Sequence, residues 1–183
     1  NTILLLSSIV FYIFGGIKFL FLLMLTVFIS YISGILISKN KNKKFWLIFG
    51  ITLNLIFLFY YKYCNFFVSN INNIFDVNFN IRNIILPIGI SFYTFQSLSY
   101  IIDVYRKGVD VQKNYFTLLL YISFFPQLIA GPIVRYSDVE NEIKKRTYSI
   151  DAFSNGVERF ILGFAKKIIL ANQIGKLADI IFS

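Results

Sequence analysis

Long uncharged apolar runs alternate with short polar segments along this chain. Asp, Glu, Lys and Arg are all absent from five of these runs, residues 3–17, 19–37, 45–61, 84–102 and 116–134. A helix needs about 17–25 mostly apolar residues to cross a bilayer. We therefore predict an all-α, polytopic membrane helical bundle with spans near these ranges. Composition agrees, because 57% of the 183 residues are apolar and 15% charged, against about 45–50% and 25% in soluble domains.

Two of the runs contain residues that interrupt a helix. Pro87 and Gly89 stand at the start of 84–102, so the regular helix should begin after them. Pro126 lies inside 116–134, and Gly131 and Pro132 lie near its end, which predicts a kink or structural break. Such breaks are tolerated at membrane depth only where protein or water satisfies the freed carbonyls.

The basic residues suggest how the runs are threaded. Lys39, Lys41, Lys43 and Lys44 lie between two runs, and clusters of this kind favour the cytoplasmic side. A complete crossing by 116–134 would then place the basic stretch 144–146 outside, against the same tendency. A re-entrant 116–134 resolves this conflict.

The segment 150–170 has the pattern of an amphipathic helix. Ser149 is a candidate N-cap, and Asp151 follows in the first turn, where negative charge suits the helix dipole. Apolar residues recur on one stripe, namely Phe153, Val157, Phe160, Ile161, Phe164 and Ile168. This spacing predicts a helix lying in the membrane interface. Packing against the cytoplasmic face of the same protein remains an alternative that does not exclude it.

One span carries a polar face. At 100° per residue, Gln96, Ser99, Tyr100 and Asp103 fall on one side of the helix predicted within 84–102, and a bilayer requires such a face to meet protein or a wet cavity. One explanation of this polar face is interhelical hydrogen bonding, worth only about 0.6 kcal/mol per contact. The other is that the face forms the wall of a reaction chamber. Arg106 stands three residues beyond Asp103 at the membrane boundary, where an ion pair or anchor is commoner than catalysis.

Charge and candidate chemistry exclude several classes of protein. The net charge of +9 comes from basic residues at the ends of apolar runs, whereas a nucleic-acid binder gathers them on one folded face. The single Cys64 allows no internal disulfide and makes no metal site. No histidine is present, so the commonest general base and metal ligand is missing. We expect no bound metal and no bound cofactor.

Two long motifs carry a resemblance. The segments 86–106 (LPIGISFYTFQSLSYIIDVYR) and 123–136 (SFFPQLIAGPIVRY) resemble the membrane-bound O-acyltransferase family, and within it the alginate O-acetyltransferase type. The resemblance continues through FILGFAKK at 160–167. It implies transfer of an acyl group from a cytoplasmic donor, acetyl-CoA or another activated acyl carrier, to a hydroxyl group. In the alginate branch the group is acetyl and the acceptor is an exported polysaccharide, reached with extracytoplasmic partner proteins.

The resemblance also limits what the chain contains. The family's catalytic histidine lies downstream of the matched region, so no catalytic residue is carried over. The chain begins at Asn1 and stops inside an apolar run. We therefore expect residues 1–183 to be a single transmembrane domain, a fragment of a larger acyltransferase domain that is inactive alone. The expected location is the bacterial cytoplasmic membrane, crossed several times.

Several residues match the motifs. The matching polar and break positions are Gln96, Asp103, Arg106, Gln127, Gly131, Pro132 and Arg135. Gln96 and Gln127 are candidates to line the acyl path. Arg106 and Arg135 are candidates to hold donor phosphates, with anchoring at lipid headgroups as the simpler alternative. Gly131 and Pro132 are most simply structural.

Other functions stay open. D-alanyl transfer to teichoic acids belongs to the same family. A secondary transporter also uses broken helices but should repeat them in inverted topology, whereas the two broken segments here are adjacent and dissimilar. A non-catalytic membrane scaffold is the third alternative.

Overall fold

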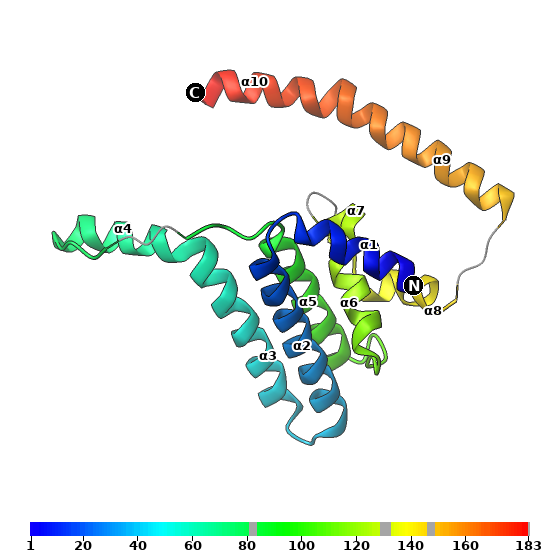
Figure 1. Ribbon diagram of the computed structural model, residues 1–183, viewed down its shortest axis with the longest axis horizontal. Helices are drawn as coiled ribbons and strands as arrows, with labels where there is room; N and C mark the ends of the chain where they lie inside the picture. The colour runs from blue at the N-terminus through cyan, green and yellow to red at the C-terminus, as the bar shows by residue number, and fades with distance from the viewer. Residues whose placement is uncertain (81–83, 129–132, 146–148, 183) are drawn as a thin grey trace. The chain divides into compact units, whose positions relative to one another are not determined.

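The computed structural model describes residues 1–80, 84–128, 133–145 and 149–182, and all regular structure in these ranges is helical. The all-α prediction is therefore confirmed for this part of the chain. By their internal contacts the residues form two compact units, Asn1–Lys144 and Lys145–Ser183, which are described separately below (Figure 1).

The first unit contains eight helices within its described residues. They are α1 (Thr2–Ile13), α2 (Ile17–Lys39), α3 (Lys43–Leu58), α4 (Cys64–Phe75), α5 (Ile90–Tyr105), α6 (Tyr115–Ser123), α7 (Phe125–Leu128) and α8 (Tyr136–Lys144). A π-helical turn, Phe59–Tyr63, joins α3 to α4 without a gap. α2 contains the predicted span 19–37, and α3 with the π turn contains 45–61.

Two helical stretches in the described residues are long and apolar enough to cross a membrane, Ile17–Lys39 and the continuous Lys43–Phe75. α1 is apolar but shorter. α5 has 16 residues, or about 24 Å at 1.5 Å per residue, against a hydrocarbon core of about 30 Å. α5 is shorter than the predicted span 84–102 because Pro87 and Gly89 delay its start to Ile90, in agreement with the start expected from the sequence.

α2, α3 and α5 lie side by side and form the centre of the first unit (Figure 1). Glycines let these helices approach closely. A Cβ on Gly50 of α3 would lie 2.5 Å from the Ser33 hydroxyl oxygen of α2, and one on Gly34 of α2 would lie 2.9 Å from the Tyr100 hydroxyl oxygen of α5. Leu23, Val27 and Ile101 are fully buried between them.

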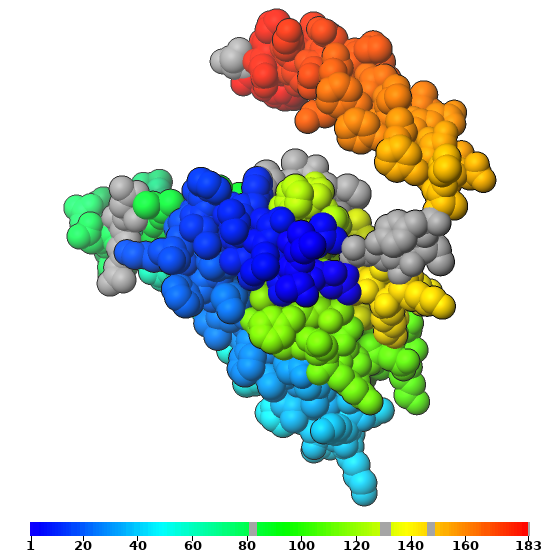
Figure 2. All heavy atoms as spheres, turned by 45° about the vertical axis from the view of Figure 1, so that its right-hand side comes forward, coloured from blue at the N-terminus to red at the C-terminus, as the bar shows by residue number. Residues whose placement is uncertain are grey.

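α1, α6 and α8 cover this centre on one side. α6 packs against α1 and α2, and α8 packs against α5 and α6; Figure 2 shows α1 lying against α6. The side chain of Asn114 caps α6 by accepting hydrogen bonds from the backbone N–H groups of Phe116 and Thr117, at 2.9 and 3.4 Å. The connection between α5 and α6 is thereby fixed at its helical end.

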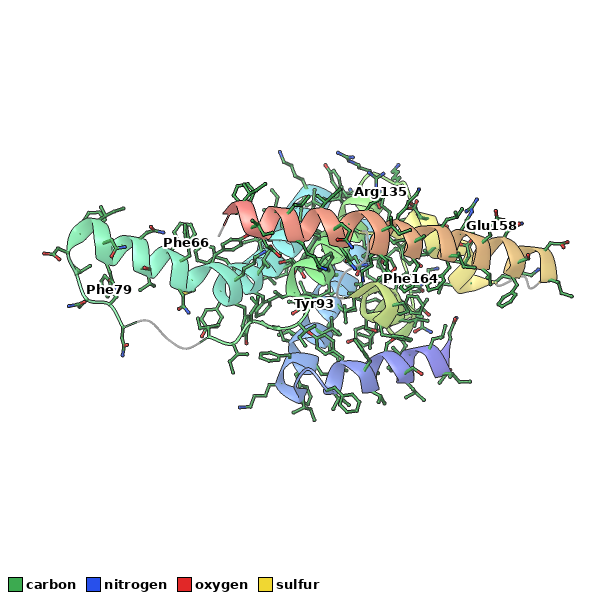
Figure 3. The ribbon with its side chains drawn as sticks, turned by 90° about the horizontal axis from the view of Figure 1, so that it is seen from above. Phe66, Phe79, Tyr93, Arg135, Glu158 and Phe164 are labelled. Atoms are coloured by element: carbon green, nitrogen blue, oxygen red, sulfur yellow. The ribbon has the colours of Figure 1, made fainter. Side chains whose placement is uncertain are left out.

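The segment between α3 and α5 is helical over its first part, α4. α4 ends at Asp76, which adopts a left-handed conformation with φ of 51°. The chain then folds back along the helix, because Asn72 donates a hydrogen bond to the carbonyl of Phe79 at 3.0 Å and accepts one from its N–H at 2.9 Å. Figure 3 labels Phe66 and Phe79 in this projecting part.

The second unit is one continuous helical rod. It comprises α9 (Ile150–Ala165), a π-helical segment (Lys166–Ala171) and α10 (Asn172–Phe182). The Ser149 hydroxyl accepts a hydrogen bond from Ala152 N–H at 3.1 Å, so the predicted N-cap is confirmed. None of the described side chains of this unit is buried. Phe160 and Phe164 stack on the predicted apolar stripe, with ring centroids 5.9 Å apart.

Candidate functional site

The two broken segments recognised in the sequence meet in the first unit. Gly89 caps the start of α5 with φ of 73°, and a Cβ there would lie 2.7 Å from the backbone carbonyl oxygen of Leu128, the last residue of α7. The Tyr12 hydroxyl of α1 donates a 3.0 Å hydrogen bond to the carbonyl of Ile88. We call this meeting of α1, the start of α5 and the end of α7 the break junction.

The break in 116–134 occurs at Phe124, where ψ is 109°, between α6 and α7. Pro126, from which a kink or break in this segment was predicted, lies two residues after Phe124, in the first turn of α7. A missing N–H costs nothing at that position. Gly131 and Pro132 lie outside the described residues.

Side chains satisfy the backbone groups that this break frees. The Gln127 amide donates a 3.0 Å hydrogen bond to the carbonyl of Tyr121, in the last turn of α6. The N–H of Phe125 donates at 3.3 Å to the Ser8 hydroxyl of α1, which itself donates to the Leu4 carbonyl at 2.8 Å. Gln127, proposed from the motif as part of the acyl path, is therefore also a cap for a helix end.

A strip of polar side chains from α5 is buried beside the junction. Tyr93, Thr94, Gln96 and Ser97 are at most 1% exposed, and Figure 3 labels Tyr93 within the bundle. The Gln96 carbonyl oxygen has no hydrogen-bond partner among the described residues. Leaving such a group unsatisfied costs about 1–3 kcal/mol. Gln96 thus presents an unsatisfied acceptor to the interior of the bundle.

The polar face predicted on α5 divides into two parts. Gln96 and Tyr100 are buried, whereas Ser99 and Asp103 are partly exposed. The Ser99 hydroxyl donates to an Asp103 carboxylate oxygen at 3.4 Å. Asp103 and Arg106 form no ion pair in the described part of the chain, and Arg106 is exposed. The ion pair considered from their spacing is absent.

Three buried tyrosines gather near Arg135. The ring of Tyr136 meets those of Tyr100 and Tyr121 edge-on, with centroids 5.3 and 5.2 Å away. Its hydroxyl accepts a 2.7 Å hydrogen bond from the Gln112 amide. Burial raises the pKa of Tyr136, so its hydroxyl stays protonated at neutral pH. Arg135, immediately before it, is exposed.

Sequence reasoning identified the polar face of α5 and the two breaks, but it missed the residues that join them. Tyr12 and Ser8 are ordinary residues of an apolar run, and Tyr136 ends the second motif without any sign of what it contacts. Only the hydroxyl contacts across the fold reveal them. No group of three or more His, Cys, Asp or Glu side chains able to hold a metal occurs among the described residues.

Comparison of the sequence with known proteins identifies the family. The whole chain is 39% identical over 191 residues to the probable alginate O-acetylase AlgI of Pseudomonas aeruginosa. Over 96% of its length it is 32% identical to a peptidoglycan O-acetyltransferase of Helicobacter pylori. About half of it, 51%, aligns at 31% identity with a teichoic acid D-alanyltransferase of Bacillus subtilis. No family model and no solved structure matches the chain.

A helical chain with these relatives belongs to the membrane-bound O-acyltransferase family. Within the family, the similarity that runs through all of the chain is to alginate O-acetylases. The chain spans 37% of the length of the Pseudomonas aeruginosa protein and 39% of the Helicobacter pylori one. The resemblance seen in the two motifs is confirmed.

Proposed function

We propose that the protein containing this chain transfers an acetyl group to hydroxyl groups of an exported polysaccharide. The observation that carries the proposal is the 39% identity to an alginate O-acetylase over all of the chain. Alginate and peptidoglycan O-acetyltransferases align with at least 96% of the chain, against about half for teichoic acid D-alanyltransferases. D-alanyl transfer is therefore the second candidate.

The transfer exchanges one bond for another at the acyl carbon. The bond from this carbon to the sulfur or oxygen of the donor breaks, a bond to the acceptor oxygen forms, and the hydroxyl proton ends on the leaving group. A general base near neutral pH assists this step. The chain has no histidine, so we place that base elsewhere in the full-length protein and assign binding roles to this part.

The buried polar strip supports a role in enclosing the acyl group. Gln96 and the break junction supply hydrogen-bonding groups inside an otherwise apolar bundle, and such groups orient a substrate in a dry cavity. Gln127 holds the junction in shape. Arg106 and Arg135 are exposed and are suited to the phosphates of acetyl-CoA or another activated acyl carrier.

We further propose a multi-pass arrangement in the bacterial cytoplasmic membrane, with residues 1–183 part of one transmembrane domain. Segment 116–134 is re-entrant in this arrangement, which the helix break at Phe124 supports. The second unit lies in the membrane interface, because its exposed apolar stripe needs a partner and lipid supplies one. Extracytoplasmic proteins then carry the acetyl group to the polysaccharide.

The test uses the full-length protein expressed in a bacterium that makes an exported polysaccharide but lacks its own acetylase. Alkali-labile acetate on the polysaccharide, absent from vector controls, is expected. Ester-linked D-alanine on teichoic acid without acetate would instead establish the second candidate. Residues 1–183 expressed alone should give no acetate. Acetylation by this piece would contradict the assignment of the general base to another part of the full-length protein.

A further inference from the structure

α4 leaves the bundle at the point where a membrane span of ordinary length ends. Lys43–Phe75 is one continuous helical stretch of 33 residues, or about 50 Å at 1.5 Å per residue, against a hydrocarbon core of about 30 Å. Counted from the lysine-rich turn, residues 43–63 by themselves cover about 31 Å. α4 therefore begins where the core ends, and Figure 1 shows it turning away from the axis of α3 after the π turn.

The π turn carries residues that are typical of a membrane surface. Tyr60, Tyr61 and Tyr63 flank Lys62 in the sequence, and tyrosine is enriched where the hydrocarbon core meets the headgroups. The Lys62 ammonium donates a 3.1 Å hydrogen bond to the Ser91 hydroxyl in the first turn of α5. The start of α4 is thereby tied to the start of α5.

α4 is amphipathic but uncharged, since Asp, Glu, Lys and Arg are absent from Cys64–Phe75. At 100° per residue, six apolar residues fall within about 120° on one side of the helix, and we call them the α4 stripe. They are Cys64, Phe67, Val68, Ile71, Ile74 and Phe75. The serine and the four asparagines of α4 lie on the remaining surface, together with Phe66.

The outer part of the α4 stripe is uncovered in the described part of the chain. Ile74 and Phe75 are 73% and 69% exposed. The return segment 77–80 lies along the side that carries Asn72, because the Asn72 side chain makes two hydrogen bonds to the backbone of Phe79. The other contacts of α4 are mainly with the π turn. The polar side is thus partly satisfied by the chain itself, whereas the apolar side needs a partner.

Three observations favour lipid as that partner. The stripe continues without a gap from a helix that is long and apolar enough to span a membrane. The tyrosines at its start mark the level of the headgroups. The helix has no charge with which to select an acidic or basic protein surface. An amphipathic helix of this kind buries its apolar face about 5–10 Å into the boundary between headgroups and acyl chains.

We propose that α4 lies flat in the membrane interface and that its stripe is covered by lipid hydrocarbon next to the headgroups. Through the bond between Lys62 and Ser91, α4 also holds the start of α5 next to this surface. The inference rests on the proposed membrane arrangement of the first unit and is independent of acyl transfer.

The test measures membrane depth in the full-length protein, reconstituted in phosphatidylcholine vesicles. Single spin-labelled cysteines are introduced after Cys64 and any other cysteine have been replaced with serine. Collisions with oxygen, which concentrates in hydrocarbon, and with a water-soluble nickel chelate report the depth of each label. A label at Ile74 should lie about 5–10 Å below the phosphates, whereas one at the adjacent Asn73, on the polar side, should lie at or above them. A label at Ile56 in α3 should be the deepest.

Two substitutions at neighbouring positions test the stripe itself. Ile74→Asp places a charge on the stripe and should move a label at Ile71 out of the hydrocarbon, because an unpaired carboxylate is costly there. Asn73→Asp adds the same charge to the polar side and should leave that label in place. Both positions are exposed, so neither change disturbs the core. Replacing phosphatidylcholine with phosphatidylglycerol should leave every depth unchanged, because α4 has no charge.

Equal access of the nickel chelate to labels at positions 73 and 74 would place α4 in water and overturn the inference. Low collision rates of both reagents at position 74 would show that protein covers the stripe, either another part of the full-length chain or a second protein, and would overturn it as well. A water-accessible label at Ile56 would count against the membrane arrangement, and the inference would fall with it.

Discussion

The hydroxyl of Tyr100 occupies the space that a side chain on Gly34 would need. A Cβ at Gly34 would lie 2.9 Å from that oxygen and 3.1 Å from the neighbouring ring carbon. The hydroxyl has little freedom to withdraw, because it accepts a hydrogen bond from Gln112 N–H and its residue is 0% exposed. The Tyr100 hydroxyl thus links the contact between α2 and α5 to the loop before α6.

Replacing Gly34 with alanine should therefore destabilise the first unit. Overpacking of this kind costs about 1–3 kcal/mol, and we expect a lower melting temperature of the detergent-solubilised protein. Gly163→Ala in α9 is the matched control, because a Cβ there meets nothing within 4 Å and alanine favours a helix interior by about 0.5–1 kcal/mol. Equal melting temperatures for the two variants would contradict the close packing.

Gly89→Ala should be more damaging than Gly34→Ala. The φ of 73° at Gly89 costs a residue with a Cβ about 1–2 kcal/mol, and the new methyl group would also meet the backbone oxygen of Leu128, which cannot rotate away. We expect little folded protein by size-exclusion chromatography. Gly156→Ala, where a Cβ has open space, should elute like the wild type.

Asn114→Ala should loosen the start of α6. Its side-chain oxygen accepts from two backbone N–H groups, and loss of such a cap costs about 0.5–2 kcal/mol. Asn114→Asp retains the acceptor and should restore most of the stability. Faster amide hydrogen exchange at Phe116 and Thr117 in the alanine variant alone is the expected measurement; unchanged exchange would argue against the cap.

Arg135→Lys separates donor binding from anchoring in the full-length protein. Loss of a bidentate, charge-assisted contact should lower kcat/KM by about one to two decades while expression is retained. Arg159→Lys in α9, also an exposed arginine, should have no effect. Normal polysaccharide acetylation by a well-expressed Arg135→Lys protein would favour the anchoring role.

The proposed threading predicts that the α2–α3 turn and the stretch 144–146 lie on one cytoplasmic side. Single cysteines at positions 42 and 147, in a Cys64→Ser background, should both resist an impermeant thiol reagent in intact cells. Both should react after the membrane is permeabilised. Labelling of position 147 but not 42 in intact cells would mean that 116–134 crosses the membrane completely.

The sequence predicts those parts of this fold that local chemistry determines. Pro87 and Gly89 correctly place the start of α5 at Ile90, because proline and a left-handed residue cannot lie inside a helix. Ser149 correctly predicts the start of α9 for a similarly local reason. Pro126 predicts a kink or break in 116–134, and the break at Phe124 lies two residues before it, because proline suits the first turn of the helix that follows.

The candidate site depends on contacts that no local pattern encodes. The approach of Gly89 to Leu128 and the bond between Gln112 and Tyr136 join residues far apart in sequence. In the sequence alone nothing pairs Gln112, which lies between α5 and α6, with Tyr136 at the end of the second motif. The exposure of Arg106 and the absence of an ion pair between it and Asp103 likewise follow from tertiary packing and not from their spacing.

The break junction also constrains the order in which this protein is made. α7 has four residues, too few to form a stable helix by itself, and its last carbonyl lies against Gly89 at the start of α5. An emerging chain therefore gains little from placing α7 in lipid until α1 and α5 are already in position to receive it. Biogenesis of this region should be a late, cooperative docking step rather than the release of one hydrophobic helix after another.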